Sequence, residues 1–208
     1  MRRTPEEAAQ TRAALLDAAL FTFAEQGVPS TKLADVAQRA GVTRGAVYHH
    51  FADKADLYAA VIAESWDTVT APVWAALEGE APLESRLSGF LVSWLRRLRE
   101  DARFRALLTL TLNASYAPAL DESPRARGSS ASREAKAFGL ADWQGRLGRT
   151  LAGAGPSAQH GGADGAGATA THLLAWLCGT AMLAAADPGL LPPADASGVA
   201  PVIRGALG

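Results

Sequence analysis

Cysteine is almost absent from this sequence of 208 residues, in which Cys178 stands alone. A single cysteine excludes an intramolecular disulfide and a cysteine-based zinc site, and its place within an apolar run favours a small core residue. Valine and isoleucine are scarce beside alanine and leucine, a composition that favours helices over sheets. The sequence therefore predicts an all-α protein.

The sequence also lacks a long hydrophobic run. Its longest nearly apolar stretch, residues 173–186, is shorter than the roughly 17–25 residues that a membrane-spanning helix needs. The first ten residues are charged and contain no apolar segment, so we expect no secretory signal. These absences predict a cytoplasmic protein in which residues 173–186 form a buried or interface helix.

An excess of positive charge is missing as well, because the net charge is −1. Basic residues that neutralise phosphates supply most of the non-specific affinity of nucleic-acid binders, so their local distribution matters more than the sum. Residues 31–54 carry a small local surplus of positive charge. The basic residues there are Lys32, Arg39, Arg44 and Lys54, and the acidic ones are Asp35 and Asp53.

Motifs of the common enzyme classes are absent. The sequence contains no GxxxxGK[ST], HExxH or GxSxG, and no cysteine–histidine metal spacing. The stretch GAGPSA, residues 153–158, follows a helical pattern rather than a strand, so it lacks the setting of a dinucleotide-binding loop. We expect neither an enzyme nor a bound cofactor or metal.

Apolar residues recur at intervals of three and four along most of the chain, which is the pattern of amphipathic helices. Residues 121–132 are polar and predict a loop or a frayed helix start, and the glycine-rich residues 153–167 predict a flexible segment. Near the N-terminus, helices are expected over residues 6–26, from about 30 to 40, over 43–51 and over 54–69.

Residues 33–51, LADVAQRAGVTRGAVYHHF, have the pattern of a helix-turn-helix. Two helices joined by a short turn must approach closely, and Ala37 offers a small side chain at that contact. Gly41 accepts the turn conformation, and Val47 closes the underside of the second helix. An ordinary helical hairpin is the structural alternative.

The second of these helices would place its remaining side chains in the major groove. Arg44 can donate two hydrogen bonds to guanine or pair with a phosphate, and Thr43 can cap the helix and reach a phosphate. Gly45 would let the backbone come close to DNA. His49 and His50 point about 100° apart on a helix, so they make a poor metal pair.

Residues 16–61 resemble the DNA-binding domain of the TetR family, whose pattern is IA-x-x-AGV-(S/T)-x-G-x-(I/L/V)-Y-x-HF-x-x-K-x-x-L. The segment TRGAVYHHF is especially similar to TRGAIYWHF of the multidrug-efflux repressors resembling AcrR. Two positions depart from the family. His49 replaces the usual tryptophan, and Lys32 stands where many relatives have serine or threonine, which moves the expected capping role to Thr31.

The resemblance implies an N-terminal helix-turn-helix domain over residues 1–54 and a helical-bundle domain for ligand binding and dimerisation over residues 55–208. It implies a repressor that binds palindromic operator DNA as a homodimer and is released by a small hydrophobic or amphipathic effector. The dimer helices would be residues 168–186 and 194–207, for which internal core is the alternative. The implied DNA contacts are Thr31, Lys32, Thr43, Arg44, Gly45, Tyr48, His49, His50 and Lys54.

Large aromatic residues recur along the second domain, and a pocket between helices of a bundle is a common place for an apolar ligand. Plain hydrophobic core is the alternative for most of them. A DNA-binding dimer that has no small-molecule effector, or one that a protein partner regulates, is the other functional possibility. The candidate ligand-binding residues are Trp66, Phe90, Trp94, Phe104, Leu108, Asn113, Trp143, His172 and Trp176.

Overall fold

The first helix begins where its sequence supplies a cap. In the computed structural model, α1 spans Pro5–Gln26, and the backbone N–H of Glu7 donates to Oγ1 of Thr4 at 3.2 Å. The N–H of Thr4 donates in return to a carboxylate oxygen of Glu7 at 2.9 Å. This pair satisfies N–H groups that the helix end leaves without partners. Gly27, at φ 76°, ends the helix as expected.

Two short helices follow, joined by a tight turn. Helix α2 spans Leu33–Arg39, and α3 spans Arg44–His50. Gly41 lies between them at φ 67°, a left-handed conformation that costs glycine little. Ala37 and Val47 are buried. The turn glycine and the two contact residues of the predicted helix-turn-helix are therefore confirmed.

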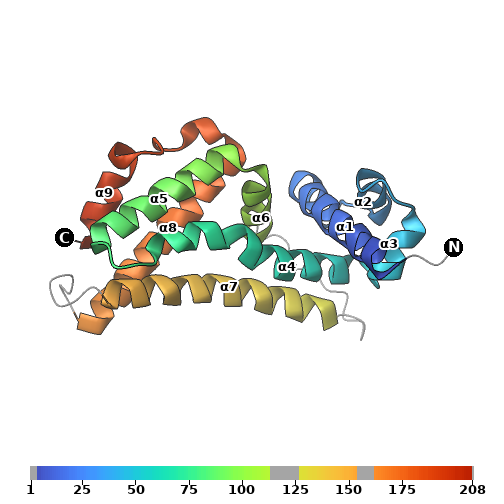
Figure 1. The fold of residues 1–208 in the computed structure, drawn as a ribbon, viewed down its shortest axis with the longest axis horizontal. Helices are drawn as coiled ribbons and strands as arrows, with labels where there is room; N and C mark the ends of the chain where they lie inside the picture. Colours follow the sequence, from blue (N-terminus) through green and yellow to red (C-terminus); the bar gives the residue numbers. More distant parts are fainter. Residues whose placement is uncertain (1–3, 113–126, 154–161, 208) are drawn as a thin grey trace. The chain divides into compact units, whose positions relative to one another are not determined.

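The structure describes residues 4–112, 127–153 and 162–207, without the side chains of 127–139 and 162–164. Within these residues every regular element is a helix, which confirms the predicted all-α fold (Figure 1). The later elements are α4 (Lys54–Trp74), η1 (Ala75–Leu77), α5 (Leu83–Glu100), α6 (Ala102–Leu112), α7 (Arg127–Ala152), α8 (Gly162–Ala186), η4 (Pro188–Leu190) and α9 (Ala196–Leu207).

The chain separates into two compact units. The first contains residues 1–67 and 106–136, and the second contains residues 68–105 and 137–208. Helix α4 begins at Lys54, so the predicted domain boundary between residues 54 and 55 falls at the start of this helix. The boundary itself stays a prediction.

The core of the first unit joins α1, α2, α3 and α4. Each helix contributes large apolar side chains that are buried almost completely, and burial of this kind is the main stabilising term in folding. Phe23 of α1 and Tyr58 of α4 pack edge to face with ring centroids 5.9 Å apart. The fully buried apolar residues include Leu15, Leu20, Val36, Val47 and Leu57.

The core of the second unit is built around aromatic rings. Trp94 of α5 packs edge to face on Phe104, with centroids 5.1 Å apart, and on Trp143 of α7, with centroids 5.6 Å apart. Its indole N–H donates to Oγ1 of Thr180 in α8 at 2.9 Å. Trp94 thus joins α5 to α6, α7 and α8, and α5 also packs against α9.

The structure decides between the alternatives left open in the C-terminal part. Helix α7 begins at Arg127, within residues 121–132 that were expected as a loop or a frayed helix start, whereas residues 162–167, expected to be flexible, belong to α8. Once part of a helix is packed, each further residue adds one hydrogen bond, so a helix can extend through weak helix formers. The remainder of the predicted flexible segment, residues 154–161, lies outside the described residues.

The apolar stretch of α8 is longer than the run of residues 173–186 on which the sequence prediction rested. Its residues 165–186 are long and apolar enough to cross a membrane by length and composition, with a mean hydropathy of 1.3. The core helices of water-soluble proteins pass the same test, and α8 packs against α5 and α9 within its unit. Met182 and Leu183 nevertheless remain 64% and 41% exposed. One face of α8 is therefore apolar and uncovered.

The start of α9 lies against the backbone of Pro193. A Cβ atom on Gly198 would be 2.0 Å from the carbonyl oxygen of Pro193, whereas one on Gly89, exposed in α5, would meet nothing within 4 Å. We expect Gly198→Ala to lower the free energy of unfolding by about 1–3 kcal/mol through overpacking. As a matched control, Gly89→Ala should raise it by about 0.5–1 kcal/mol. Urea unfolding checks both, and equal changes for the two variants would contradict the close approach.

Candidate nucleic-acid interface

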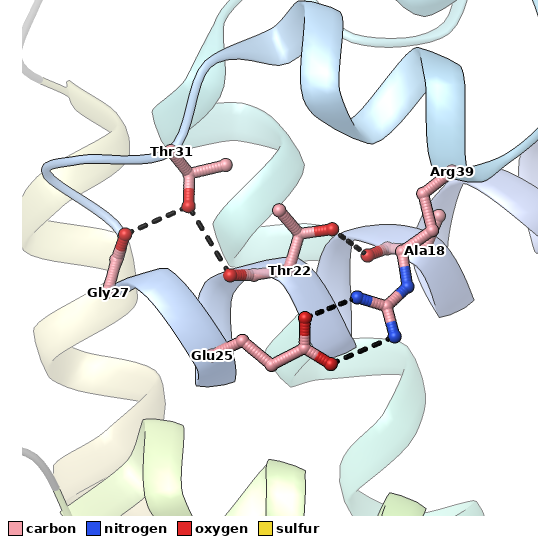
Figure 2. A network of polar contacts seen from close by, with 6 residues as sticks. All are labelled: Ala18, Thr22, Glu25, Gly27, Thr31 and Arg39. Atoms are coloured by element: carbon pink, nitrogen blue, oxygen red, sulfur yellow. Dashed lines mark hydrogen bonds and ion pairs between the residues drawn. The ribbon is translucent and has the colours of Figure 1, made fainter.

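An ion pair binds α2 to the end of α1 (Figure 2). The terminal nitrogens of Arg39 donate to the two carboxylate oxygens of Glu25 at 2.5 and 2.9 Å. The guanidinium carbon of Arg39 lies 5.2 Å from the centroid of the Phe21 ring. The hydrogen bond from Arg39 lowers the pKa of Glu25. A two-point contact of this kind fixes orientation, so it helps to set the angle at which α2 leaves α1.

Thr31 connects the same two helices through its hydroxyl group. The Oγ1 atom donates to the carbonyl oxygen of Gly27 at 2.8 Å and lies 3.5 Å from that of Thr22 (Figure 2). The prediction that Thr31 caps α2 is wrong, because Lys32 occupies the N-cap position and its backbone N–H donates to the carboxylate of Asp35 at 3.3 Å. Thr31 is only 2% exposed. A buried hydroxyl must find a nearby acceptor, and the end of α1 supplies one.

The exposed face of α3 carries Arg44 and Tyr48, one turn apart. A terminal nitrogen of Arg44 donates to the Tyr48 hydroxyl oxygen at 3.2 Å, and its guanidinium carbon lies 5.6 Å from the centroid of the Tyr48 ring. This hydrogen bond raises the pKa of Arg44. Tyr48 is 48% exposed. The pair therefore presents a positive charge and the remaining guanidinium N–H donors to solvent, the groups that bind guanine edges or phosphates.

Thr43, Gly45 and His49 are exposed beside this pair. Oγ1 of Thr43 accepts from the backbone N–H of Ala46 at 3.3 Å, which confirms its predicted capping role. A Cβ on Gly45 would meet only Oγ1 of Thr43, at 3.9 Å. The packing of the protein itself therefore does not require glycine at this position, which leaves the backbone of the first turn open to a ligand.

The two adjacent histidines differ in exposure. His49 is exposed and His50 is half-buried, and their rings meet edge to face with centroids 5.4 Å apart. In the described part of the chain, no group of three histidine, cysteine, aspartate or glutamate side chains could hold a metal ion.

The four basic residues of the segment 31–54 differ in their exposure and in their partners. Lys32 and Arg44 are exposed. Arg39 is paired with Glu25, and Nζ of Lys54 donates to the carbonyl oxygens of Pro29 and Thr31 at 2.9 and 3.0 Å. The positive charge offered to a ligand is therefore concentrated on Lys32 and Arg44.

Sequence reasoning missed two stabilising contacts of this unit. Arg39 forms an ion pair with Glu25 of α1, and Arg12 of α1 forms one with Glu64 of α4. The guanidinium group of Arg12 also lies over the Phe51 ring, with its carbon 5.2 Å from the centroid. No local spacing signals pairs that are 14 and 52 residues apart, so only correlated changes among related sequences could have indicated them.

Residues 15–61, which contain this helix-turn-helix, match the family described as bacterial regulatory proteins, tetR family. This segment is a TetR-family domain. The chain is 42% identical over 99 residues to the HTH-type transcriptional regulator AcrR of Shigella flexneri, covering 47% of this chain and 42% of AcrR. The HTH-type transcriptional regulator TtgR of Pseudomonas putida is 53% identical over 62 residues, 30% of each chain. The predicted kinship with AcrR-like repressors is confirmed.

The sequence similarity thus spans less than half the length of these two relatives. A solved structure extends the comparison to the whole TetR-type fold. SmeT, described as the repressor of the Stenotrophomonas maltophilia multidrug efflux pump SmeDEF, is 27% identical in its complex with triclosan, with a TM-score of 0.69 over 95% of this chain and 90% of SmeT. All three relatives are named as regulators or repressors rather than enzymes, in agreement with the sequence prediction.

The candidate ligand-binding residues are divided between the two units. Trp66, half-buried, and Leu108, buried, belong to the first. Asn113 lies outside the described residues. His172 is exposed and Trp176 is half-buried on α8. The residues that the structure brings into one cluster in the second unit are Phe90, Trp94, Phe104 and Trp143, together with Trp74.

Two surface hollows of the second unit lie away from this cluster. One, of about 580 Å³, is lined by residues of α5 and α9, including Glu84 and Arg204. The other, of about 630 Å³, lies where α5 meets α6 and is lined by residues such as Arg96 and Asp101. Neither includes a predicted ligand-binding residue. The assignment of these residues to an effector site stays a prediction.

Proposed function

We propose that this chain is a transcriptional repressor that binds palindromic operator DNA as a homodimer. The observation that carries the proposal is the exposed Arg44–Tyr48 pair on α3, held by a short turn against α2 within the TetR-family segment. A helix in this position can enter the major groove. Lys32, Thr43, Gly45 and His49 are also exposed, and we assign them to the same surface.

The proposed dimer uses α8 and α9. A single recognition helix reads few base pairs, so two copies related by a two-fold axis would read half-sites about one helical turn apart. Met182 and Leu183 of α8 and Leu190 of η4 are large apolar side chains that remain exposed in the single chain. A second copy covering them would remove this apolar surface from water.

The proposed effector is a small hydrophobic or amphipathic molecule. SmeT, which shares the fold, has been solved in complex with triclosan. In this chain the buried aromatic cluster around Trp94 is the proposed region of the effector site. A ligand that prefers one orientation of α4 would change the distance between the two recognition helices, so that it no longer matches the spacing of the operator half-sites. By linkage, DNA would weaken ligand binding by the same factor by which the ligand weakens DNA binding.

A repressor without a small-molecule effector is the second candidate. The ring contacts within the aromatic cluster favour it, because side chains that are already packed against one another fill the space that a ligand would need. Thermal unfolding of the protein with a library of hydrophobic compounds separates the two candidates. Concentration-dependent stabilisation by any compound supports the effector, whereas the absence of stabilisation supports the second candidate.

The proposal is tested by selecting duplexes from a randomised DNA library with the purified chain. We expect an inverted repeat to be enriched and the protein to sediment as a dimer, both free and on the selected duplex. Enrichment of a single half-site by a monomer would contradict the proposed homodimer. The absence of any enriched sequence would contradict sequence-specific DNA binding.

A further inference from the structure

The connection between α1 and α2, residues 27–32, is held by several polar contacts. The N–H and the hydroxyl of Thr31 both donate to the carbonyl oxygen of Gly27, at 3.2 and 2.8 Å. The carbonyl oxygens of Pro29 and Thr31 accept from Nζ of Lys54, at 2.9 and 3.0 Å. Thr31 thus uses its N–H, its hydroxyl and its carbonyl group within the domain.

Lys54 reaches this connection from the first turn of α4, 25 and 23 residues away along the chain. An ammonium group is a compact donor that can satisfy several acceptors that converge on one point. The side chain is half-buried, and burial lowers the pKa of Lys54. An ammonium that extended into solvent toward a phosphate would leave these two carbonyl oxygens without their donor.

Lys32 provides the contrast, because it adjoins Thr31 and occupies the N-cap position of α2. Its side chain is exposed. Two lysines that the sequence places in one class of DNA contact therefore differ in structure: one is directed to solvent, and the other is engaged by backbone carbonyl groups.

We propose that Lys54 is a positioning residue rather than a phosphate contact: it ties the start of α4 to the α1–α2 connection and so fixes where Lys32 and α2 lie. This inference rests on the proposed DNA-binding function and deepens it. Loss of the tie would let the connection move, which would reduce affinity for the matched operator more than affinity for unrelated DNA, since only the operator requires the correct geometry.

Lys54→Met, which keeps the length of the side chain but removes its donors, tests the proposal with Lys32→Met as the matched control. Affinities are measured over a series of salt concentrations for the duplex that the wild-type chain selects and for a duplex of unrelated sequence. We expect Lys54→Met to lower affinity for the selected duplex roughly tenfold, with little change for the unrelated duplex and an unchanged salt slope. Loss of a phosphate contact would instead reduce the slope of log affinity against log salt concentration by about 0.9 and weaken binding to both duplexes. We expect this result for Lys32→Met.

Lys54→Arg keeps donors for both carbonyl oxygens and should restore selectivity for the selected duplex. If Lys54→Met reduces the slope by about 0.9, or if Lys54→Arg fails to restore selectivity, the positioning role is overturned.

Hydrogen exchange of the DNA-free protein gives a second readout, which does not depend on the proposed function. Peptides covering residues 27–33 should exchange faster in Lys54→Met than in the wild-type chain, and Lys32→Met should leave their exchange unchanged. Unchanged exchange in Lys54→Met would refute the proposal that Lys54 holds the connection between α1 and α2. A wild-type chain that selects no duplex would overturn the proposed function, while the exchange measurement would still decide whether Lys54 holds the connection. A variant that fails to fold is replaced in both experiments by Lys54→Gln, to which the same two outcomes apply.

Discussion

Arg44→Ala is expected to weaken binding to the selected operator duplex roughly tenfold to a hundredfold. The guanidinium group is exposed on α3 and contacts the Tyr48 ring and hydroxyl, so its removal deletes the donors that we propose contact DNA. The fold should not change, because the polar contacts that the structure gives Arg44 go only to Tyr48 of the same helix. Fluorescence anisotropy at fixed salt measures the affinity, and circular dichroism verifies the helix content.

Two further variants distinguish what Arg44 contacts. Arg44→Lys keeps the charge but loses the two-point geometry, so a guanine contact predicts a loss close to that of Arg44→Ala, and a phosphate contact predicts a much smaller one. Tyr48→Phe keeps the ring under the guanidinium group and removes the hydroxyl acceptor, so it should weaken binding less than Arg44→Ala. Operator affinity that is unaffected by Arg44→Ala would refute the assignment of α3 as the reading helix.

Trp94→Ala is expected to lower the free energy of unfolding by about 3–5 kcal/mol. Trp94 is buried and contacts the rings of Phe104 and Trp143, so truncation leaves a cavity among side chains that cannot easily collapse. For a chain of this length, each kcal/mol corresponds to roughly 2–4 °C in the melting temperature. Urea unfolding followed by circular dichroism at 222 nm measures the change.

Thr180→Val separates the hydrogen bond of Trp94 from its packing. Valine fills nearly the same volume as threonine but cannot accept from the indole N–H, which would remain buried without that partner. We expect a loss of about 1–3 kcal/mol, less than for Trp94→Ala. A loss below about 1 kcal/mol for Trp94→Ala would show that the aromatic cluster is not the tightly packed core that the ring contacts indicate.

The same cluster bears on the proposed effector. A binding site needs space, and ring contacts of 5.1 to 5.6 Å between centroids describe side chains that support one another. An effector that enters here must displace at least one ring and pay for the lost packing with its own contacts. Compounds with flat aromatic surfaces, which could replace a displaced ring, are therefore the first to screen.

Local residue patterns were sufficient to predict the helix-turn-helix. The left-handed turn at Gly41, the cap at Thr43 and the buried undersides at Ala37 and Val47 depend on residues within a few positions of one another. The exposure of Arg44 follows from the same helical period. These features are encoded at short range, since backbone conformation and helix periodicity are local properties.

The roles of Thr31, Arg39 and Lys54 could not be predicted in this way. Arg39 and Lys54 have partners 14 and 25 residues away. The hydroxyl of Thr31 donates to the carbonyl oxygen of Gly27, only four residues away, but it reaches that atom because packing sets the path of the connection between α1 and α2. By sequence, Lys54 and Lys32 are equivalent basic residues beside a recognition helix. Only the folded domain brings two carbonyl oxygens within reach of the Lys54 ammonium group and leaves the Lys32 ammonium group in solvent.

By itself, the sequence determined that the protein is helical, that residues 15–61 contain a TetR-type helix-turn-helix, and which face of α3 is exposed, because each of these follows from spacing along the chain. The tertiary structure alone decided which positive charges are exposed to solvent and which hold the domain together. A donor takes whichever acceptor the fold brings near, and proximity across 25 residues is a property of packing rather than of pattern.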